Sequence, residues 1–190
     1  YTDPAFDRML ESQRVQPMLT VDTSWLLVGH VDETIAFLAA DGMPRGWTVG
    51  INNARQAWQK FEELQADGLG ATPMFVGKEW DPGETAEITI DEVLADPDLA
   101  SANQKAVIEV EGQLETIQEA TGVPDEDLVE FPFVHYDLYG YSVAYQPGFV
   151  NGIHIDRSNY APPKGHGVLI DGEYLFQEWV TDNLAEIGLS

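Results

Sequence analysis

The sequence of 190 residues contains no cysteine. Disulfides, cysteine-ligated zinc, iron–sulfur clusters and a cysteine nucleophile are therefore excluded within this chain. Positive charge is also scarce, since nine Lys and Arg stand against 33 Asp and Glu and the formal net charge is −24. This balance argues against a nucleic-acid backbone or an anionic membrane as a partner. It suits a cationic ligand, bound calcium or simply solvated acidic surfaces.

Long apolar runs are missing as well. No stretch of 18 apolar residues occurs, so the sequence predicts no membrane-spanning helix. The start, Tyr1-Thr2-Asp3-Pro4, shows no charged and then apolar leader. We nevertheless expect an extracellular, secreted protein from the acidic, cysteine-free and lysine-poor composition, with the cytoplasm as the alternative. Hydrophobic residues make up 44% of the chain, which is enough for a real core in one domain or most of a larger one.

Short apolar runs alternate with segments of helical period, which predicts an α/β or α+β fold. Four helices are expected, each after a capping residue or a turn: residues 4–15, 53–66 and 97–120, and a last helix between Gly172 and Gly188. Strands are expected at residues 25–28, 74–76, 128–134 and 149–155. Pro132 cannot donate to a strand ladder, so we expect the strand at 128–134 to lie at a sheet edge.

The sharpest local feature is Gly29-His30-Val31-Asp32-Glu33, directly after an apolar run. If that strand continues, His30 and Asp32 point to the same face and share one site at the strand end. Such ends are common catalytic positions in α/β folds, and His is the natural proton shuttle near neutral pH. The alternative interpretation is a cap and turn with a surface histidine.

The other histidines carry weaker signals. His154-Ile155-Asp156 repeats the His-x-Asp spacing, so a metal-dependent hydrolase using both pairs is a further hypothesis. We favour a satisfied strand-end histidine, because the usual metallohydrolase spacings are absent. His135 lies in an aromatic stretch and is expected to pack. His166, between two glycines, is expected to face solvent.

A longer pattern surrounds the first His-x-Asp. Residues 21–33, Val-Asp-Thr-Ser-Trp-Leu-Leu-Val-Gly-His-Val-Asp-Glu, closely resemble the signature of protein-arginine deiminases. Further segments resemble that family in the same order along nearly the whole chain: residues 11–17, 55–68, 122–132, 147–151, 163–164 and 167–172. The first motif is highly specific, and the shared order supports the others.

The resemblance implies a pentein fold, the five-bladed α/β propeller of guanidine-modifying enzymes. Residues 1–190 would form two to three of its modules, as part of the catalytic domain without the first modules and without the nucleophile segment. In the family, the His of Gly-His-Val-Asp is the general acid/base and the Asp binds the substrate guanidinium. These match His30 and Asp32. Val28 matches a residue whose side chain lies beside the guanidinium, and Asn151 matches an Asn near the substrate.

The activity implied is hydrolysis of peptidyl-arginine to peptidyl-citrulline plus ammonia. A guanidinium is planar, charged and forked, so carboxylate oxygens accept its N–H groups in pairs. Its carbon is a poor electrophile, so the reaction needs a strong nucleophile and an acid for the departing ammonia. His30 could donate that proton and then activate water.

The chain departs from the family pattern at the nucleophile. The family uses a cysteine shortly after the segment that matches residues 167–190, and this chain has none. The resemblance therefore implies companion polypeptide chains that carry the cysteine and the rest of the domain. Three explanations of the missing cysteine remain open. The protein is nicked, the chain is a part of a longer protein, or it is a non-catalytic relative that binds arginine-rich partners. Calcium is a possible cofactor by resemblance, although no loop here matches an EF-hand or the family's ligand set.

Overall fold

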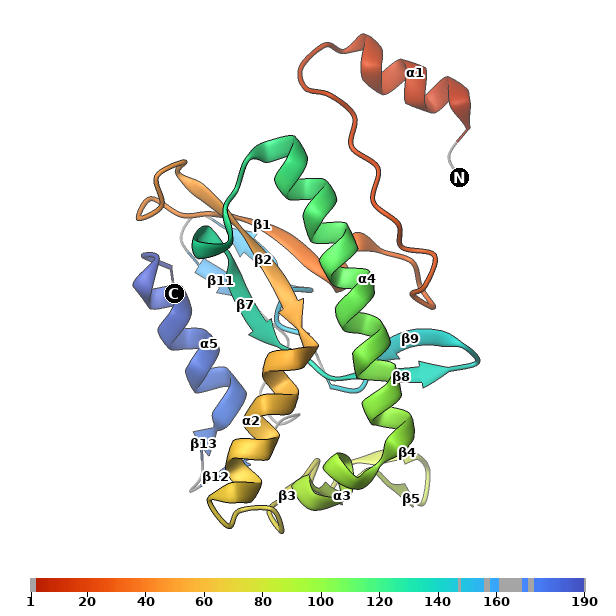
Figure 1. The fold of residues 1–190 in the computed structure, drawn as a ribbon, viewed down its shortest axis with the longest axis vertical. Coiled ribbons are helices and arrows are strands. Elements are labelled where there is room, and N and C mark those ends of the chain that lie inside the picture. The colour runs from red at the N-terminus through yellow and green to blue at the C-terminus, as the bar shows by residue number, and fades with distance from the viewer. Residues whose placement is uncertain (1–2, 147, 156–157, 161–168, 171–172, 190) are drawn as a thin grey trace.

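A computed structural model gives the fold of residues 3–146, 148–155, 158–160, 169–170 and 173–189, a mixed α/β arrangement (Figure 1). Its α-helices are α1 (Pro4–Ser12), α2 (Ala54–Ala66), α3 (Ile90–Ala95), α4 (Pro97–Thr121) and α5 (Leu175–Glu186), with short 3-10 helices η1 (Val31–Glu33) and η2 (Asp125–Asp127). Its strands are β1 (Ile35–Ala39), β2 (Trp47–Asn53), β3 (Pro73–Met74), β4 (Glu79–Asp81), β5 (Glu84–Thr85), β6 (Ile88–Thr89), β7 (Val129–Pro132), β8 (His135–Leu138), β9 (Tyr141–Ala144), β10 (Ile153–Ile155), β11 (Ser158–Tyr160), β12 (Leu169–Ile170) and β13 (Glu173–Tyr174).

The centre of the fold is a three-stranded sheet in the order β1–β2–β7. β1 and β2 are antiparallel, whereas β2 and β7 are parallel, with Gly50 opposite Val129 and Asn53 opposite Pro132. A parallel pair needs a long crossover, and here that connection contains α2, α3 and α4. The edge position predicted for the strand around Pro132 is confirmed.

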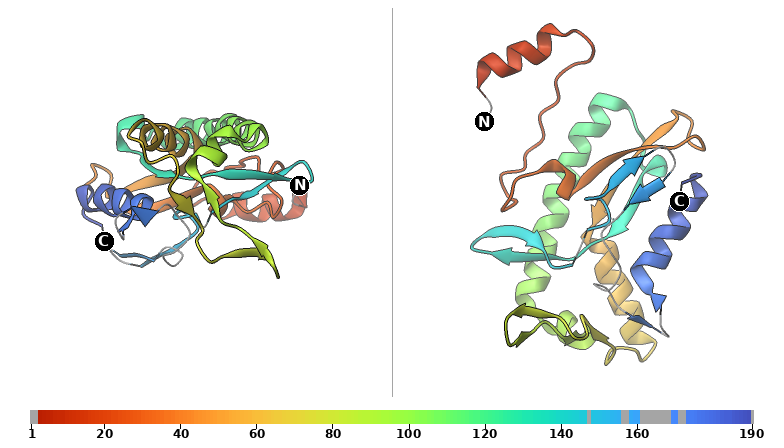
Figure 2. Two further views of the ribbon diagram at one scale, coloured as in Figure 1. Left: turned by 90° about the horizontal axis from the view of Figure 1, so that it is seen from below. Right: turned by 180° about the vertical axis from the view of Figure 1, so that it is seen from behind.

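Helices cover both faces of this sheet (Figure 2). On one face α4 packs Ile117 against Ile35, Val49 and Ile51, and α2 lies beside it. On the other face α5 packs Val180 and Leu184 against Leu38, Val129 and Phe131. None of the described helices is both long and apolar enough to cross a membrane.

The caps of α2 and α4 confirm the helix predictions. The Asn53 side chain accepts a hydrogen bond from Gln56 N at 2.9 Å, and α2 begins there. Asp96 accepts from Asp98 N and Leu99 N, with Pro97 in the first turn of α4. α4 ends at Gly122, whose φ of 69° is the left-handed conformation that glycine adopts most easily.

Other predictions are corrected. The first helix ends at Ser12 rather than near residue 15. At this end the Ser12 hydroxyl donates to Met9 O at 2.7 Å. The helix α1 has no buried residue and lies apart from the sheet and its covering helices (Figure 1). Residues 25–28 make only one bridge, Leu26 to Ser142, and not a strand. The predicted strand at 149–155 begins at Ile153, and the one at 74–76 ends at Met74 because Phe75 has a φ of 56°.

Several elements were not predicted, among them β2, α3 and the hairpin β8–β9. β2 is hidden in the sequence because buried Thr48, Gly50 and Asn52 interrupt its apolar pattern. The Thr48 hydroxyl donates to Asp127 O, which satisfies its buried polar group. The described strands form no closed barrel, and the propeller remains a prediction.

Candidate active site

The segment that carries His30 and Asp32 begins at a buried anchor. Trp25 and Leu26 are buried and pack on Ala106 and Val110 of α4. Ser142 of β9 fixes their backbone, because Ser142 N donates to Trp25 O at 2.8 Å and Leu27 N donates to Ser142 O at 3.0 Å. The chain therefore enters the candidate site from a fixed position at the junction of α4 and the β8–β9 hairpin.

The segment ends at a second anchor in the central sheet. Asn52 of β2 is buried, and its backbone N donates to Thr34 O at 2.9 Å. Its side-chain nitrogen donates to Glu33 O at 2.5 Å. An amide side chain at this buried place thus satisfies a carbonyl that the short helix η1 leaves free at its end.

Buried Gln113 of α4 connects the two ends. Its amide nitrogen donates to Asp22 O at 2.6 Å, and its amide oxygen accepts from the Thr34 hydroxyl at 2.8 Å. One side chain therefore holds residues that lie before and after the candidate catalytic loop. This arrangement restricts how far the loop between the anchors can move.

Between the anchors the chain turns instead of continuing as a strand. Gly29 has a φ of 79°, and residues Val31–Glu33 then form η1. His30 N donates to the Glu33 carboxylate at 2.9 Å, and Glu33 N donates to His30 O at 3.2 Å. The alternation that was expected to place His30 and Asp32 on one strand face is therefore wrong, and the local structure is that of the alternative interpretation, a cap and turn with an exposed histidine. They lie two residues apart around a tight turn, and within the described part of the chain no hydrogen bond joins their side chains.

The loop is exposed, including its apolar side chains. His30 and Asp32 are exposed, and Val28 is 61% exposed. Leu27 and Val31 are exposed as well. An imidazole, a carboxylate and three apolar side chains in one anchored loop can bind a cation with an apolar stem, because they supply a charge partner and a nonpolar surface together.

Asn151 lies at a small cavity beside this loop. The cavity has a volume of about 60 Å³, and its lining residues are Leu26, Glu33, Phe133, His135, Val143, Ala144, Gly148 and Asn151. Leu26 and Glu33 flank the His30 loop, so the structure brings Asn151 next to the loop although 118 or more residues separate them. His30, Asp32 and Val28 do not line the cavity. The space holds a few water molecules rather than a large ligand.

His135 forms a buried wall of the same cavity. Its ring centroid lies 4.6 Å from that of Phe133 and 5.6 Å from that of Trp25, which confirms the packing prediction. Its Nδ1 is 2.8 Å from the Ser142 hydroxyl, while its buried Nε2 has no hydrogen-bond partner. Burial lowers the pKa of His135 to about 3, so the ring is neutral at physiological pH. The neutral ring therefore brings no charge to the cavity that it lines.

The metal hypothesis receives no support from the other histidine. His154 in β10 accepts a hydrogen bond on Nε2 from Ala39 N at 3.1 Å, as expected of a strand histidine. Asp156 and His166 lie outside the described residues. Among the residues that the structure does describe, no three His, Asp or Glu side chains gather as a metal would require. The carboxylates described here therefore do not fit a calcium site, and we derive no chemical step through calcium.

Two residues at this site were not singled out for function from the sequence. Glu33 belongs to the signature itself, three residues after His30, and its positioning role is visible only in the bond that its carboxylate accepts from His30 N. His135 was assigned to packing alone, and no short-range pattern connects it with Glu33 or Asn151. Only the pairing of β8 with β9 brings His135 beside Ser142 and the cavity.

Comparison with known proteins identifies the family. A family model described as protein-arginine deiminase (PAD) matches residues 3–190. Protein-arginine deiminase type-3 of Rattus norvegicus is 29% identical over 181 residues, which cover 95% of this chain and 27% of that protein. Type-4 of Mus musculus is 28% identical over 97% of this chain and 28% of that protein, and type-1 of Homo sapiens is 26% identical over 97% and 27%. This chain spans about a quarter of the length of these relatives, and it belongs to the protein-arginine deiminase family.

Proposed function

We propose that this chain forms part of a hydrolase that converts peptidyl-arginine to peptidyl-citrulline and ammonia. Membership of the deiminase family supports the reaction class. The observation that carries the proposal for this chain is the exposed His30–Asp32 loop, held between buried anchors. Fixed anchors reduce the conformational entropy that a loop loses when it binds substrate.

Asp32 is the proposed partner of the guanidinium. A carboxylate accepts two parallel N–H groups of a guanidinium, which fixes both charge and orientation. Val28 lies three residues from η1 and is 61% exposed, so it supplies an apolar surface for the plane of the bound group. Asn151, at the cavity next to the loop, is the proposed polar neighbour of the substrate.

His30 is the proposed general acid and base. In the first step a nucleophile attacks the guanidinium carbon, and His30 gives its proton to the nitrogen that leaves as ammonia. In the second step His30 takes a proton from water, whose oxygen becomes the carbonyl oxygen of citrulline as the nucleophile leaves. The Glu33 carboxylate holds the backbone of His30 at 2.9 Å and so positions the loop for both steps.

The sulfur nucleophile comes from outside these 190 residues, because the chain has no cysteine. We propose that other polypeptide segments, on companion chains or on a longer chain, supply it and complete a five-bladed propeller around the site. The exposed apolar side chains of Leu27, Val28 and Val31 are consistent with coverage by such a segment or by substrate. An extracellular location, proposed from composition alone, is testable by fractionation of the producing cells.

A non-catalytic module that binds arginine-rich partners is the second candidate. The net charge of −24 and the absence of cysteine favour it. In such a module Asp32 would still bind guanidinium groups, but His30 would have no role in turnover. The two functions therefore differ in their chemistry and not in their ligand.

The deciding assay incubates the complete protein with an arginine peptide, with and without added calcium. We expect citrulline and ammonia in equal amounts, and a loss of both in Asp32→Asn. Peptide binding that persists without either product would instead establish the non-catalytic module. A matched peptide with citrulline in place of arginine serves as the control for guanidinium recognition.

A further inference from the structure

The hairpin β4–β5 presents an exposed tryptophan at an irregular position. Glu79 pairs with Thr85 and Asp81 pairs with Glu84, so Trp80 between them has no cross-strand partner and is the bulged residue. Bulges redirect side chains, and this one brings the Trp80 ring within 5.6 Å of Tyr145 and 6.2 Å of Phe75. Trp80 is nevertheless 54% exposed. One side of the Trp80 ring is thus held by Tyr145 and Phe75, and the rest of the ring is exposed to solvent.

A second hairpin extends this aromatic surface. Tyr136 of β8 is 42% exposed, and its ring lies 6.3 Å from that of Tyr145. The hairpins β4–β5 and β8–β9 lie on the same side of α4 in both views (Figures 1 and 2). We define the aromatic platform as Trp80, Tyr136 and the buried Tyr145 beneath them. β8 also carries His135, which lines the cavity beside the His30 loop, so neighbouring residues of one strand contribute to the cavity and to the platform.

The segment that carries Trp80 is rich in negative charge. Residues 78–98 contain eight carboxylates and one lysine. Asp81 and Glu84 are exposed and stand directly opposite each other at the end of the hairpin, an arrangement of like charges that destabilises a strand pair. Burial, with a smaller contribution from the Asp96 carboxylate, raises the pKa of Tyr145 to about 12, so Asp96 acts electrostatically on the platform. A bound cation would relieve the repulsion between Asp81 and Glu84.

We propose that the aromatic platform and the Asp81–Glu84 carboxylate pair form a docking surface for an arginine-rich segment of the substrate protein. The proposal rests on the proposed function, since it locates where the substrate binds beyond the modified residue. Arginine fits because its guanidinium stacks flat on an indole ring and also donates to carboxylates. The charge of the surface and that of the segment are complementary, and the redirected Trp80 supplies the stacking face.

Binding of a fluorescent arginine-rich peptide to the complete protein tests the proposal. Trp80→Leu keeps an apolar side chain on Tyr145 but removes the stacking face, and should weaken binding about two- to fivefold. Trp80→Phe retains a ring and should weaken it less. Equal binding by Trp80→Leu and the unchanged protein would overturn the role of the platform.

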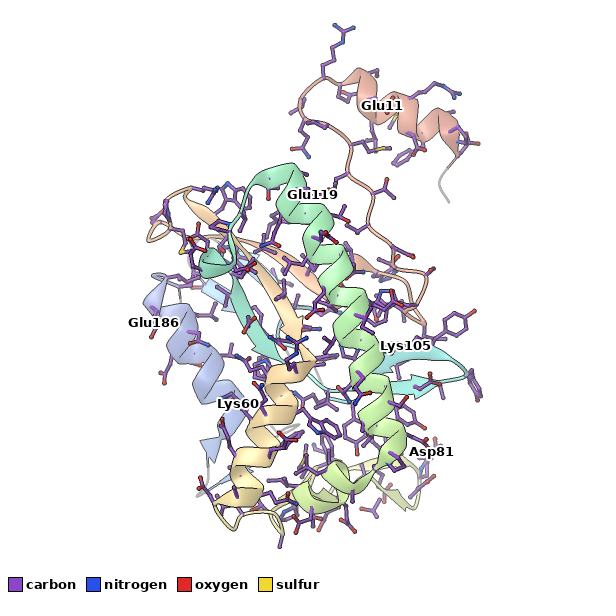
Figure 3. The ribbon with its side chains drawn as sticks, viewed as in Figure 1. Glu11, Lys60, Asp81, Lys105, Glu119 and Glu186 are labelled. Carbon is purple, nitrogen blue, oxygen red and sulfur yellow. The ribbon has the colours of Figure 1, made fainter. Side chains whose placement is uncertain are left out.

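The carboxylates need a control for overall charge. Asp81→Asn with Glu84→Gln should weaken binding about fivefold at low salt and much less at high salt. Glu115→Gln with Glu119→Gln makes the same change of net charge on α4, and Figure 3 shows Glu119 near the opposite end of that helix from Asp81. Equal weakening by the two pairs would overturn the proposal, because the effect would then belong to net charge alone.

A small substrate separates this proposal from the proposed function. A blocked single arginine has one guanidinium and cannot occupy the His30 loop and the platform at once, so Trp80→Leu should lower citrulline formation from the long peptide only. If neither substrate gives citrulline while Trp80→Leu still loses peptide binding, the docking surface stands and the hydrolase fails. If citrulline forms but Trp80→Leu treats both substrates like the unchanged protein, the docking surface fails and the hydrolase stands.

Discussion

The Gln113 amide oxygen accepts a hydrogen bond of 2.8 Å from the Thr34 hydroxyl, in the interior between α4 and the end of η1. The same amide donates to Asp22 O at 2.6 Å, so one buried side chain joins both ends of the His30 loop. The two groups are 79 residues apart in the sequence. This bond makes the geometry of the candidate site depend on a helix that carries none of the proposed catalytic residues.

Gln113→Leu should therefore destabilise the protein and disturb the loop together. The change leaves Asp22 O without its donor, whereas the Thr34 hydroxyl keeps its 3.1 Å bond to Val31 O, so we expect a cost of about 1–3 kcal/mol for the one group that stays unsatisfied. Urea unfolding gives the loss of stability, and the citrulline assay gives the loss of activity. Gln118→Leu, whose amide bonds Asp125 on an exposed part of α4, should change both far less. Similar effects of the two changes would contradict a special role for Gln113.

Gly50→Ala should destabilise the central sheet. A Cβ at Gly50 would lie 2.6 Å from the Phe131 ring and 3.2 Å from Leu38, so the core must shift at a cost of about 1–3 kcal/mol. Gly112→Ala is the matched change in α4, where a Cβ meets no atom within 4 Å. It should stabilise the protein by about 0.5–1 kcal/mol, because alanine loses less backbone entropy in a helix. Thermal unfolding measures the effect of both changes. Midpoints that shift in the same direction for Gly50→Ala and Gly112→Ala would contradict this prediction.

His135 should make the folded protein lose stability in acid. Its pKa is about 3 in the fold, below the value near 6.5 of an exposed histidine, so the unfolded chain binds the extra proton between these limits. The contribution of His135 is complete above about pH 6.5 and falls by up to about 1.4 kcal/mol per pH unit as the pH drops toward 3. His135→Phe should remove this part of the slope. Phe133→Leu, which alters the same packing without a titrating group, should retain it, and parallel slopes in all three proteins would disprove the assignment.

Helices α2 and α4 were predictable because their boundary signals are local. Asn53 and Asp96 cap the two helices as their positions in the sequence indicate, and Gly122 ends α4. The edge position of β7 was predictable for a similar reason, since Pro132 lacks a donor. In each case one residue and its immediate neighbours contain the physical cause.

β2 was not predictable in this way, and the turn at His30 was foreseen only as the alternative to a strand. Asn52 looks like a loop residue, but it is buried because Glu33 O accepts its amide hydrogen. The apolar run at residues 25–28 looks like a strand, yet it makes a single bridge and Gly29 then turns the chain. Both outcomes depend on partners distant in sequence, Glu33 for one and Ser142 for the other.

The residues of the candidate site show the same difference between local signals and distant partners. His30, Asp32 and Val28 were predicted together because one short motif contains all three, and the structure places them in one exposed loop. The place of Asn151 beside that loop depends on the cavity, and so does that of His135. The sequence thus indicated the chemistry of the loop, whereas its neighbours required the packing of β8 and β9.

Citrulline formation by His30→Gln in the complete protein is the most direct test of the central claim. His30 is exposed, so the change should leave the unfolding midpoint almost unaltered while turnover falls by about 10²–10⁴-fold. His154→Gln, at a histidine that only accepts from the Ala39 backbone, should retain most of the turnover. A folded His30→Gln protein that forms citrulline at the rate of the unchanged protein would contradict the account.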